Sequence, residues 1–513
     1  MKTFLLFAGL LTGSAFADVK LAAVFSNHMV LQQEQPIRIF GSAAPGEAIK
    51  AELAGKSAST TAGQDGAFRV DLPAMKADGK AHTLTVSGKN TVTVSDVLLG
   101  EVWICSGQSN MEWSVRSSLN AKEVTDGANH PQIRLFDVPG HVQGPAPAPG
   151  RGKWVVCSPQ TIPGFTAVGY HFGRSLHEKL AVPVGLVGTN WGGTRIEPWT
   201  PPVGFEQVES LGDYRDNIKS IDPRTEAGKA SHMKYLASVD AWVAKGKAAV
   251  AAGTHLAGDP PRFNLRPKGG ATHIYNGMVH ALTPLSVRGA IWYQGESNAG
   301  DGLRYEYLKE ALVKGWRSVF ENEALSFYWV QLADFQAVSK NPAGGGWGPV
   351  REGQRRALRI PNTGMAVIID IGAERDIHPR NKHDVGKRLA LWALANDYGQ
   401  DLVYSGPLYK SMSVEGDKIR IAFDHIGGGL MTGKKEGLEP TTEVPGAELA
   451  EFAIQSADGA WHWAKAKIDG ETVLVWAEGV KAPKHVRFGY QSNPASHNLY
   501  NKAGLPASPF TTE

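Results

Sequence analysis

The stretch VWICSGQSN, residues 102–110, decides the fold of this chain, because an apolar run breaks abruptly into a turn of small residues. The apolar part, 102–105, predicts a buried strand, and Gly107 opens the turn. Such a turn exposes the Ser109 hydroxyl at the end of the strand, where the N–H groups and the positive end of a following helix point at the same spot. The stretch therefore predicts a serine nucleophile at the edge of a sheet.

Apolar strand candidates alternate with helical segments on either side of this stretch, from residue 98 to residue 401. The strand candidates are 98–99 with 102–105, 184–187, 290–293, 328–332 and 365–371, and the helical segments are 170–180, 305–320 and 384–396. This alternation predicts an α/β fold with a doubly wound parallel sheet. A polar segment rich in alanine and lysine interrupts the alternation at 205–270 and predicts a helical insertion.

Short strands separated by turn residues flank this central part of the chain. Residues 18–97 are Thr- and Val-rich segments punctuated by glycine and aspartate, and a strand pattern returns at 402–513. Both flanks are typical of small β-sandwich-like domains. We therefore expect an N-terminal β-domain at 18–97, a catalytic domain at 98–401 and a C-terminal β-domain at 402–513.

The composition excludes partners that are recognised by charge. The 513 residues contain 53 Lys and Arg against 50 Asp and Glu, so the formal net charge is only +3. Such a balance gives no long-range field for nucleic acid or an anionic membrane. Beyond the N-terminus, no apolar run reaches the roughly 18 residues of a spanning helix. We therefore expect a small or neutral substrate.

The N-terminus has the pattern of a secretory signal peptide. Lys2 precedes the apolar segment 4–11, and Ala15-Phe16-Ala17 provides a small-x-small cleavage site. Cleavage after residue 17 predicts export to the periplasm or out of the cell. In such an oxidising compartment Cys105 and Cys157 either form a disulfide or remain free, with Cys105 buried at a strand end.

Nothing in the sequence requires a metal or another cofactor. The two cysteines lack the spacing of a zinc site, and no His-Glu-x-x-His motif occurs. His383 and Asp384 lie next to each other, but no third ligand accompanies them, and we expect Asp384 to cap the following helix. We therefore expect neither a catalytic metal nor a cofactor.

Four distinctive loops follow the predicted strands. They read GQSN at 107–110, GTNWGGT at 188–194, QGESN at 294–298 and DIHP at 376–379. In doubly wound sheets the carboxyl ends of the strands carry the ligand site. Acyl transfer needs a nucleophile, a base, a group that orients the base, and N–H donors for the oxyanion. These loops contain all four.

With these loops in view, the chain resembles the SGNH hydrolase superfamily and, within it, the sialate O-acetylesterase-like carbohydrate esterases. The matching segments are 27–32, 100–111, 191–199, 292–298, 376–382, and 498–501 with 504–506. The resemblance implies Ser109 as nucleophile, His378 as base and Asp376 as its partner. It also implies that the N–H groups of Ser109 and Gly193 hold the oxyanion.

The third loop departs from the superfamily's Gly-x-Asn pattern. Gln294 ends the strand and Asn298 comes four residues later, so either amide is a candidate for the remaining oxyanion donor. We expect Gln294, because its position at the strand end aims it towards Ser109, and we keep Asn298 as the alternative. Asp376 stands only two residues before His378, where many superfamily members have three.

Several neighbouring residues have two interpretations. Arg195 either pairs with Glu197 or grips a substrate carboxylate, and we expect the ion pair. Trp191 either stacks on a sugar or packs against the sheet, whereas Trp292, on a strand, is expected to pack. Glu296 is expected to have a structural role.

Together these residues predict an exported serine esterase that removes O-acetyl groups from a carbohydrate. Sialic acid and acetylated xylan, xyloglucan or mannan remain open as substrates. A protein of another class, a catalytically inactive carbohydrate-binding protein, is the remaining alternative.

Overall fold

One long strand, β8 (Thr91–Gly107), links two parts of the molecule. Its first residues pair antiparallel with β7 (His82–Ser87), and its last pair parallel with β11 (Val184–Asn190) and β12 (Gly289–Tyr293). Exposed and buried residues alternate up to residue 96, and every residue from 97 to 107 is buried. The change marks the passage from a sheet with one solvated face to a sheet covered on both faces. The predicted boundary at 97/98 thus lies inside a strand.

The computed structural model describes residues 18–256, 258–263 and 267–513. The predicted signal peptide, residues 1–17, lies outside the described residues. Within them, no helix is long and apolar enough to cross a membrane. Cys105 and Cys157 are both buried and free, so the alternative of a disulfide is wrong in this structure.

The central sheet has the strand order β10-β9-β11-β8-β12-β13-β14. The strands not yet bounded are β9 (His130–Asp137), β10 (Trp154–Cys157), β13 (Ser326–Val330) and β14 (Thr363–Ala366). All neighbours from β9 to β14 run parallel, and β10 is antiparallel at the edge. The α/β prediction is therefore confirmed at the level of a mixed α/β fold. The sequence pattern missed the strands β9 and β10.

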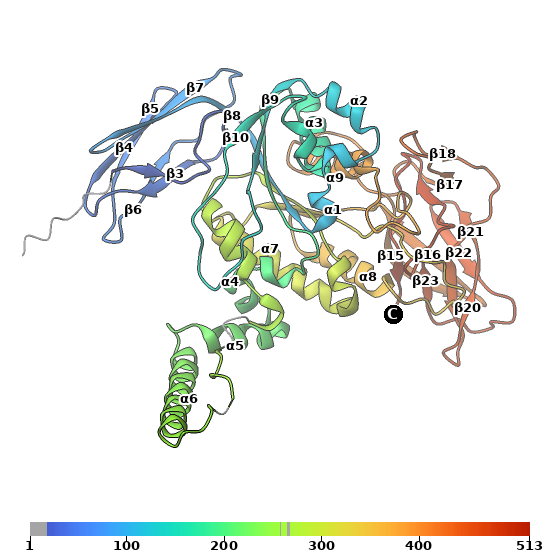
Figure 1. Cartoon of the computed structure of the whole chain (residues 1–513). Coiled ribbons are helices and arrows are strands. Elements are labelled where there is room, and N and C mark those ends of the chain that lie inside the picture. Colours follow the sequence, from blue (N-terminus) through green and yellow to red (C-terminus); the bar gives the residue numbers. More distant parts are fainter. Residues whose placement is uncertain (1–17, 257, 264–266) are drawn as a thin grey trace, which may run out of the picture.

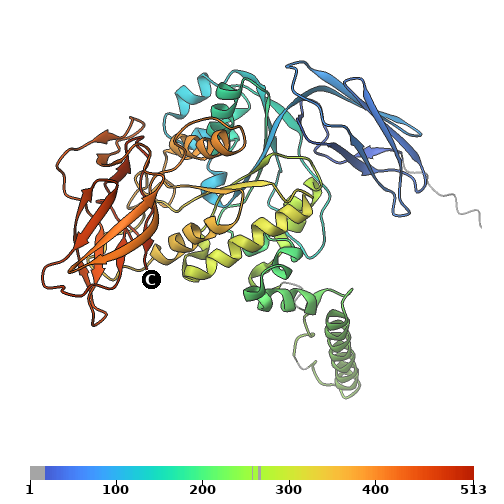
Figure 2. The ribbon, with the colours of Figure 1, turned by 180° about the vertical axis from the view of Figure 1, so that it is seen from behind.

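Helices cover both faces of this sheet (Figure 1 and, from behind, Figure 2). On one face α3 (Ala167–Leu180) packs against α9 (Lys382–Asn396), and on the other lie α4 (Pro202–Glu206) and α7 (Tyr305–Val319). Trp103 of β8 packs edge-on against Phe172 of α3, with ring centroids 5.0 Å apart. Trp292 is buried and packs against Trp316 of α7, as expected for a strand tryptophan. Shorter helices are α1 (Ser109–Glu112), α2 (Ala121–Asp126) and α8 (Gly348–Arg356).

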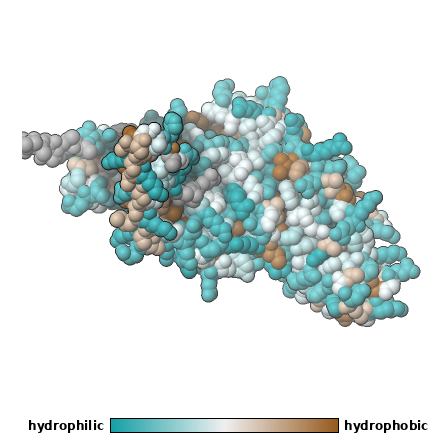
Figure 3. Space-filling view, turned by 60° about the horizontal axis from the view of Figure 1, so that its bottom comes forward, coloured by the Kyte–Doolittle hydropathy of each residue, from teal (hydrophilic) through white to brown (hydrophobic). Residues whose placement is uncertain are grey.

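A helical arm projects from the central part between β11 and β12. It consists of α5 (Gly212–Ile221) and α6 (Glu226–Ala251), and α6 extends away from the body of the molecule (Figures 1 and 2). Of the 26 residues of α6, only Gly228 and Gly246 are buried. Apolar side chains such as Met233 and Val250 are exposed, and Figure 3 shows apolar surface along this arm.

Two β-rich parts lie at opposite ends of the central domain (Figure 1). The N-terminal part has one sheet of β1 (Lys20–Leu21), β3 (Ile37–Ser42) and β6 (Ala67–Leu72), and a second of β4 (Ala48–Leu53), β5 (Lys56–Thr61), β7 and β8, while β2 (Val30–Gln32) pairs with β8. Its apolar core is continuous with that of the central domain. The N-terminal part and the central domain therefore form one packed unit.

The C-terminal part has its own apolar core, built around residues such as Ile421, Val475 and Phe488. Its strands are β15 (Leu408–Glu415), β16 (Lys418–Asp424), β17 (Leu430–Lys434), β18 (Thr442–Glu443), β19 (Phe452–Gln455), β20 (Trp461–Trp463), β21 (Lys465–Asp469), β22 (Thr472–Trp476), β23 (Val486–Phe488), β24 (Leu499–Asn501) and β25 (Phe510–Thr511). They form three small sheets. This part nevertheless reaches α9, where Lys435 pairs with Asp384 at 2.8 Å.

Candidate active site

The turn after β8 holds Ser109 in a fixed place. Gly107 has φ +145°, and a Cβ there would lie 2.1 Å from the carbonyl oxygen of Tyr293, so only glycine fits. The Gln108 N–H donates to the same carbonyl at 2.9 Å. Ser109 is then the first residue of α1, whose leading N–H groups have no partners within the helix. Because α1 has only four residues, these N–H groups matter more than a helix dipole.

His378 meets Ser109 as a base should meet its nucleophile. Its Nε2 lies 2.9 Å from the Ser109 Oγ, within hydrogen-bond distance. The imidazole stacks on the Trp113 ring, with centroids 4.8 Å apart and planes at 13°. Burial lowers the pKa of His378 below its ordinary 6.5, the charge of Lys382 lowers it further, and Asp376 acts in the opposite direction. The imidazole is therefore neutral at pH 7 and able to accept a proton.

Asp376 is near the base but does not hold its ring. Its Oδ1 lies 3.8 Å from the His378 Nδ1, longer than a hydrogen bond, and the side chain is 49% exposed. The same oxygen accepts the main-chain N–H of His378 at 2.9 Å. In this structure Asp376 therefore orders the loop, and its role as the partner of the imidazole stays a prediction.

The loop after β11 lies beside Ser109. A Cβ on Gly192 would come within 3.3 Å of the Ser109 Cβ. The Gly192 N–H donates to Glu112 Oε2 at 2.7 Å. Gly193, with φ +72°, borders open space, since apart from its two chain neighbours no residue has an atom within 4 Å of the position of its absent Cβ. The N–H of Gly192 is therefore occupied, and the oxyanion role of the Gly193 N–H stays a prediction.

Two residues that the sequence pattern did not reveal support this loop. Glu112, on the same short helix as Ser109, accepts a hydrogen bond from His141 Nε2 at 2.8 Å in addition to the one from Gly192. The His141 ring in turn stacks on Trp191, with centroids 4.7 Å apart and planes at 9°. Trp191 is half-buried and its main-chain N–H donates to the Gly107 oxygen at 3.0 Å, while its sugar-stacking role stays a prediction.

The Gln294 side chain is buried and fully engaged. Its amide donates to the Thr194 carbonyl at 3.2 Å and to Asn298 Oδ1 at 2.6 Å, and its oxygen accepts from the Tyr305 hydroxyl at 2.7 Å. The structure therefore does not aim a free Gln294 N–H at Ser109, contrary to the reason given for preferring it. The donor role stays a prediction, and it requires Gln294 to give up one buried hydrogen bond.

Asn298, the alternative donor, is also buried and engaged. Its amide donates to Glu197 Oε2 at 3.1 Å and to Asp301 Oδ2 at 2.8 Å. The same two carboxylates bind Arg195, at 2.7 and 2.6 Å. The expected pair of Arg195 with Glu197 is thus present, and two carboxylates rather than one oppose the guanidinium charge.

The segment after His378 corrects one expectation. The residue that caps α9 is Asn381, whose side chain accepts the Asp384 N–H at 3.1 Å, so the prediction that Asp384 is the cap was wrong. Asp384 instead lies in the first turn, where a carboxylate also suits a helix start. Among the residues that the structure describes, no three His, Cys, Asp or Glu side chains gather as they would around a metal ion.

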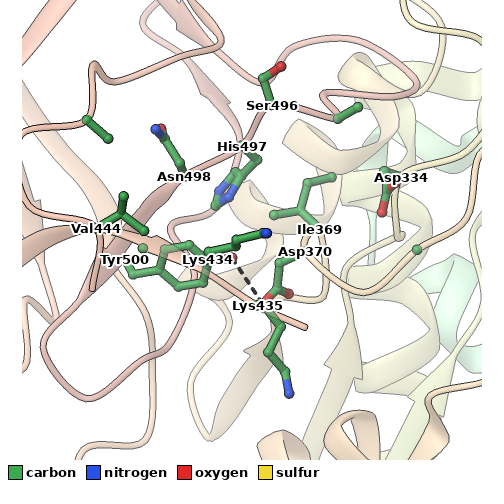
Figure 4. Close-up of a pocket in the computed structure, with 14 residues that line it drawn as sticks. Asp334, Ile369, Asp370, Lys434, Lys435, Val444, Ser496, His497, Asn498 and Tyr500 are labelled. Carbon is green, nitrogen blue, oxygen red and sulfur yellow. Dashed lines mark hydrogen bonds between the residues drawn. The ribbon is translucent and has the colours of Figure 1, made fainter. Parts of the chain in front are cut away.

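A separate cavity of about 390 Å³ lies between the central and C-terminal domains (Figure 4). Asp334, Asp370, Lys434, His497 and Tyr500 are among its lining residues, and the Tyr500 hydroxyl donates to Asp370 Oδ2 at 3.5 Å. Neither the nucleophile nor the base lines it. The hydrogen bond between Ser109 and His378, and not the size of a cavity, therefore marks the candidate reaction centre.

Comparisons with known proteins find carbohydrate esterases. A family model, the carbohydrate esterase, sialic acid-specific acetylesterase family, matches residues 99–233 and 253–394. Sialate O-acetylesterase of Rattus norvegicus is 31% identical over 441 residues, covering 77% of each chain. The enzyme of Mus musculus is 30% identical over 452 residues, covering 78% of each. Among solved structures, a carbohydrate acetylesterase from Xanthomonas citri is 35% identical, with a TM-score of 0.78 over 96% of this chain and 99% of that one. This chain therefore belongs to the sialic acid-specific acetylesterase family of carbohydrate esterases and is a carboxylic-ester hydrolase.

Proposed function

We propose that this protein is an exported serine esterase that removes O-acetyl groups from a carbohydrate. The observation that carries the proposal is the 2.9 Å contact between Ser109 Oγ and His378 Nε2 at the carboxyl edge of a parallel sheet. We further assign the central domain to the SGNH type, flanked by the two β-domains. The order and direction of the central strands support this assignment.

In the first half of the reaction His378 takes the proton of Ser109 as the Oγ attacks the acetyl carbonyl carbon. The N–H groups of Ser109 and Gly193 stabilise the resulting oxyanion. The tetrahedral intermediate collapses, the bond to the sugar oxygen breaks, and His378 gives its proton to that oxygen. In the second half His378 removes a proton from a water molecule as the water oxygen attacks the acetyl carbon of the acetyl-serine. The bond between that carbon and Ser109 Oγ then breaks, His378 returns the proton to Oγ, and acetate leaves.

The relatives named above support a sialate-type substrate, but one observation favours a second candidate. Recognition of a sialic acid carboxylate calls for an available cation, and Arg195 is already paired with Glu197 and Asp301. That pairing supports a neutral acetylated polysaccharide, such as xylan, xyloglucan or mannan. Acetate release from O-acetylated sialoglycan and from acetylated xylan, measured side by side, decides between the two.

The alternative of an inactive carbohydrate-binding protein predicts no turnover on any acetyl ester. Release of acetate by the wild-type protein, absent in Ser109→Ala, would exclude it. Export rests on the sequence of residues 1–17, and we expect the secreted form to begin at Asp18. Fractionation of the producing cells and N-terminal sequencing test this, and a full-length protein in the cytoplasm would contradict it.

A further inference from the structure

The residue after the nucleophile, Asn110, joins three separate loops. Its side chain is buried, and its amide donates to Glu296 Oε1 at 2.6 Å and to the main-chain oxygen of Ile377 at 2.9 Å. Its oxygen accepts from Lys382 Nζ at 2.5 Å. These partners come from the loop after β12, the residue before His378, and the first residue of α9. Asn110 thereby fixes the spacing between nucleophile and base.

Lys382 is the unusual member of this network. It is fully buried, and its Nζ lies 5.3 Å from the centre of the Tyr293 ring and 5.9 Å from that of Trp113, the ring on which His378 stacks. Aromatic faces stabilise a cation at such distances. Burying an ammonium group is expensive, and an apolar side chain of similar size often replaces a buried charge without loss of stability. Stability alone therefore does not explain a lysine here.

The charge of Lys382 acts directly on the base. The charged groups that affect His378 are Asp376 in its own loop and Lys382 on α9, while α1 and the residue after it present the uncharged Ser109 and Trp113. A positive charge nearby disfavours the imidazolium form. Lys382 thus helps to keep the His378 imidazole unprotonated, and able to act as a base, at acid pH. Asp376 has the opposite effect on the imidazole.

The titration of Lys382 itself fits this action. Burial lowers its pKa to about 7, while the carboxylates of Glu296 and Asp376 act to raise it. The ammonium form therefore dominates below pH 7, the same range in which His378 would otherwise gain a proton.

We propose that Lys382 is a positioning residue of this esterase, which holds the Ser109 and His378 loops together through Asn110 and whose charge extends the working range of the base towards acid pH. The proposal rests on the roles of Ser109 and His378 in the proposed function. Glu296, at the other end of the network, accepts the hydrogen bond that orients the Asn110 amide.

Two variants separate the effect of the hydrogen bond between Lys382 and Asn110 from the effect of the charge of Lys382. Lys382→Met removes both, while Lys382→Gln removes the charge and keeps an N–H group that can bond to Asn110. The matched control is Lys387→Met, which removes an exposed lysine from the same helix. The measurement is kcat/KM for p-nitrophenyl acetate as a function of pH, together with the thermal transition of each protein.

The acid limb of the pH profile is the range in which kcat/KM falls as the pH decreases. We expect this limb to move to higher pH by about half a unit or more in both Lys382 variants. Lys382→Met should also lose roughly tenfold to a hundredfold in kcat at the optimum, because nucleophile and base drift apart. Lys382→Gln should recover most of that rate, and the control should match the wild type. A residue that only stabilises the fold would lower the rate without moving the limb.

An unmoved acid limb in both Lys382 variants, or an equal shift in Lys387→Met, would overturn the proposal. Should Lys382→Met fail to fold, Lys382→Gln decides alone through the position of its limb. Ser109→Ala is assayed in parallel: if it still turns over the ester, the proposed function fails, whereas an inactive Ser109→Ala with unmoved limbs refutes only the role of Lys382.

Discussion

The loops that carry Ser109 and His378 are built in opposite ways. Ser109 follows the end of β8 by two residues, and main-chain hydrogen bonds and the glycine at 107 leave the turn no alternative path. His378 lies in residues 367–381, between β14 and α9, with no regular structure of its own. Other segments position it, through the Trp113 ring and through the bond from Asn110 to the residue before it.

The difference teaches that the sheet fixes the proposed nucleophile, whereas the position of the proposed base depends on side chains from other segments. Changes in the serine turn should therefore abolish chemistry outright. Changes around the histidine loop should be graded, according to how many of its supports they remove.

The largest effect is expected for Ser109→Ala. Loss of the nucleophile should lower kcat by about 10⁴-fold or more. The half-buried side chain bears on the reaction and not on packing, so the thermal transition should stay unchanged. Acetate release and calorimetry measure the two. Near-wild-type turnover by a folded Ser109→Ala variant would show that Ser109 is not the nucleophile, and the comparison of the two loops would then no longer hold.

His378→Ala should cost about 10³- to 10⁴-fold in kcat, as removal of the base does in other triads. In the wild type, activity should be lost as the pH falls through the pKa of His378, because the protonated imidazole cannot accept the serine proton. Burial and Lys382 lower that pKa, so the midpoint of the acid limb should lie below 6.5. A midpoint well above 6.5 would show that another group controls the limb.

Glu112→Ala should reduce kcat about tenfold to a hundredfold, because the oxyanion loop loses its tie at Gly192 while its chemistry stays intact. KM should change less than kcat. Glu112→Gln, which can still accept the Gly192 N–H, is the matched control and should stay close to the wild type. Equal losses of kcat in both variants would mean that the charge of Glu112, and not its hydrogen bond with Gly192, matters.

The smallest effect is expected for Asp376→Ala, at about tenfold in kcat. Its carboxylate is half-exposed and 3.8 Å from the imidazole, so its contribution is screened. Steady-state kinetics on the purified variant provides the test. A loss of 10³-fold would instead show that Asp376 closes on the His378 ring during turnover, and that the histidine loop is as tightly specified as the serine turn.

Sequence patterns were sufficient where the signal is local. The strand that ends at Gly107, the helices α3, α7 and α9, and the Ser and His motifs all carry their chemistry in a few consecutive residues. Strand β9 was missed because it mixes polar with apolar residues, and β10 was missed because it has only four residues. Local patterns also placed a domain boundary inside β8, since a strand that changes its surroundings halfway looks like two.

The contacts that support the site could not be predicted from such patterns, because they join residues that are far apart in the sequence. Gly192 is 80 positions from Glu112, and Lys382 is 272 positions from Asn110. The choice of Gln294 as donor shows the same limit. Its place at a strand end was visible in the sequence, but Thr194 and Tyr305, which occupy its amide, were not.

The unbroken course of β8 has a consequence for how this enzyme can be shortened. Residues 30–32 lie alongside residues 98–100 as a neighbouring strand, and the Gln32 side chain accepts the Val102 N–H at 2.8 Å. A protein that starts at residue 98 would thus lose one side of the strand that ends at the nucleophile. We therefore expect that proteolysis or gene truncation can separate the C-terminal domain from the catalytic domain more easily than the N-terminal one. The N-terminal domain is part of the same structural unit as the catalytic domain.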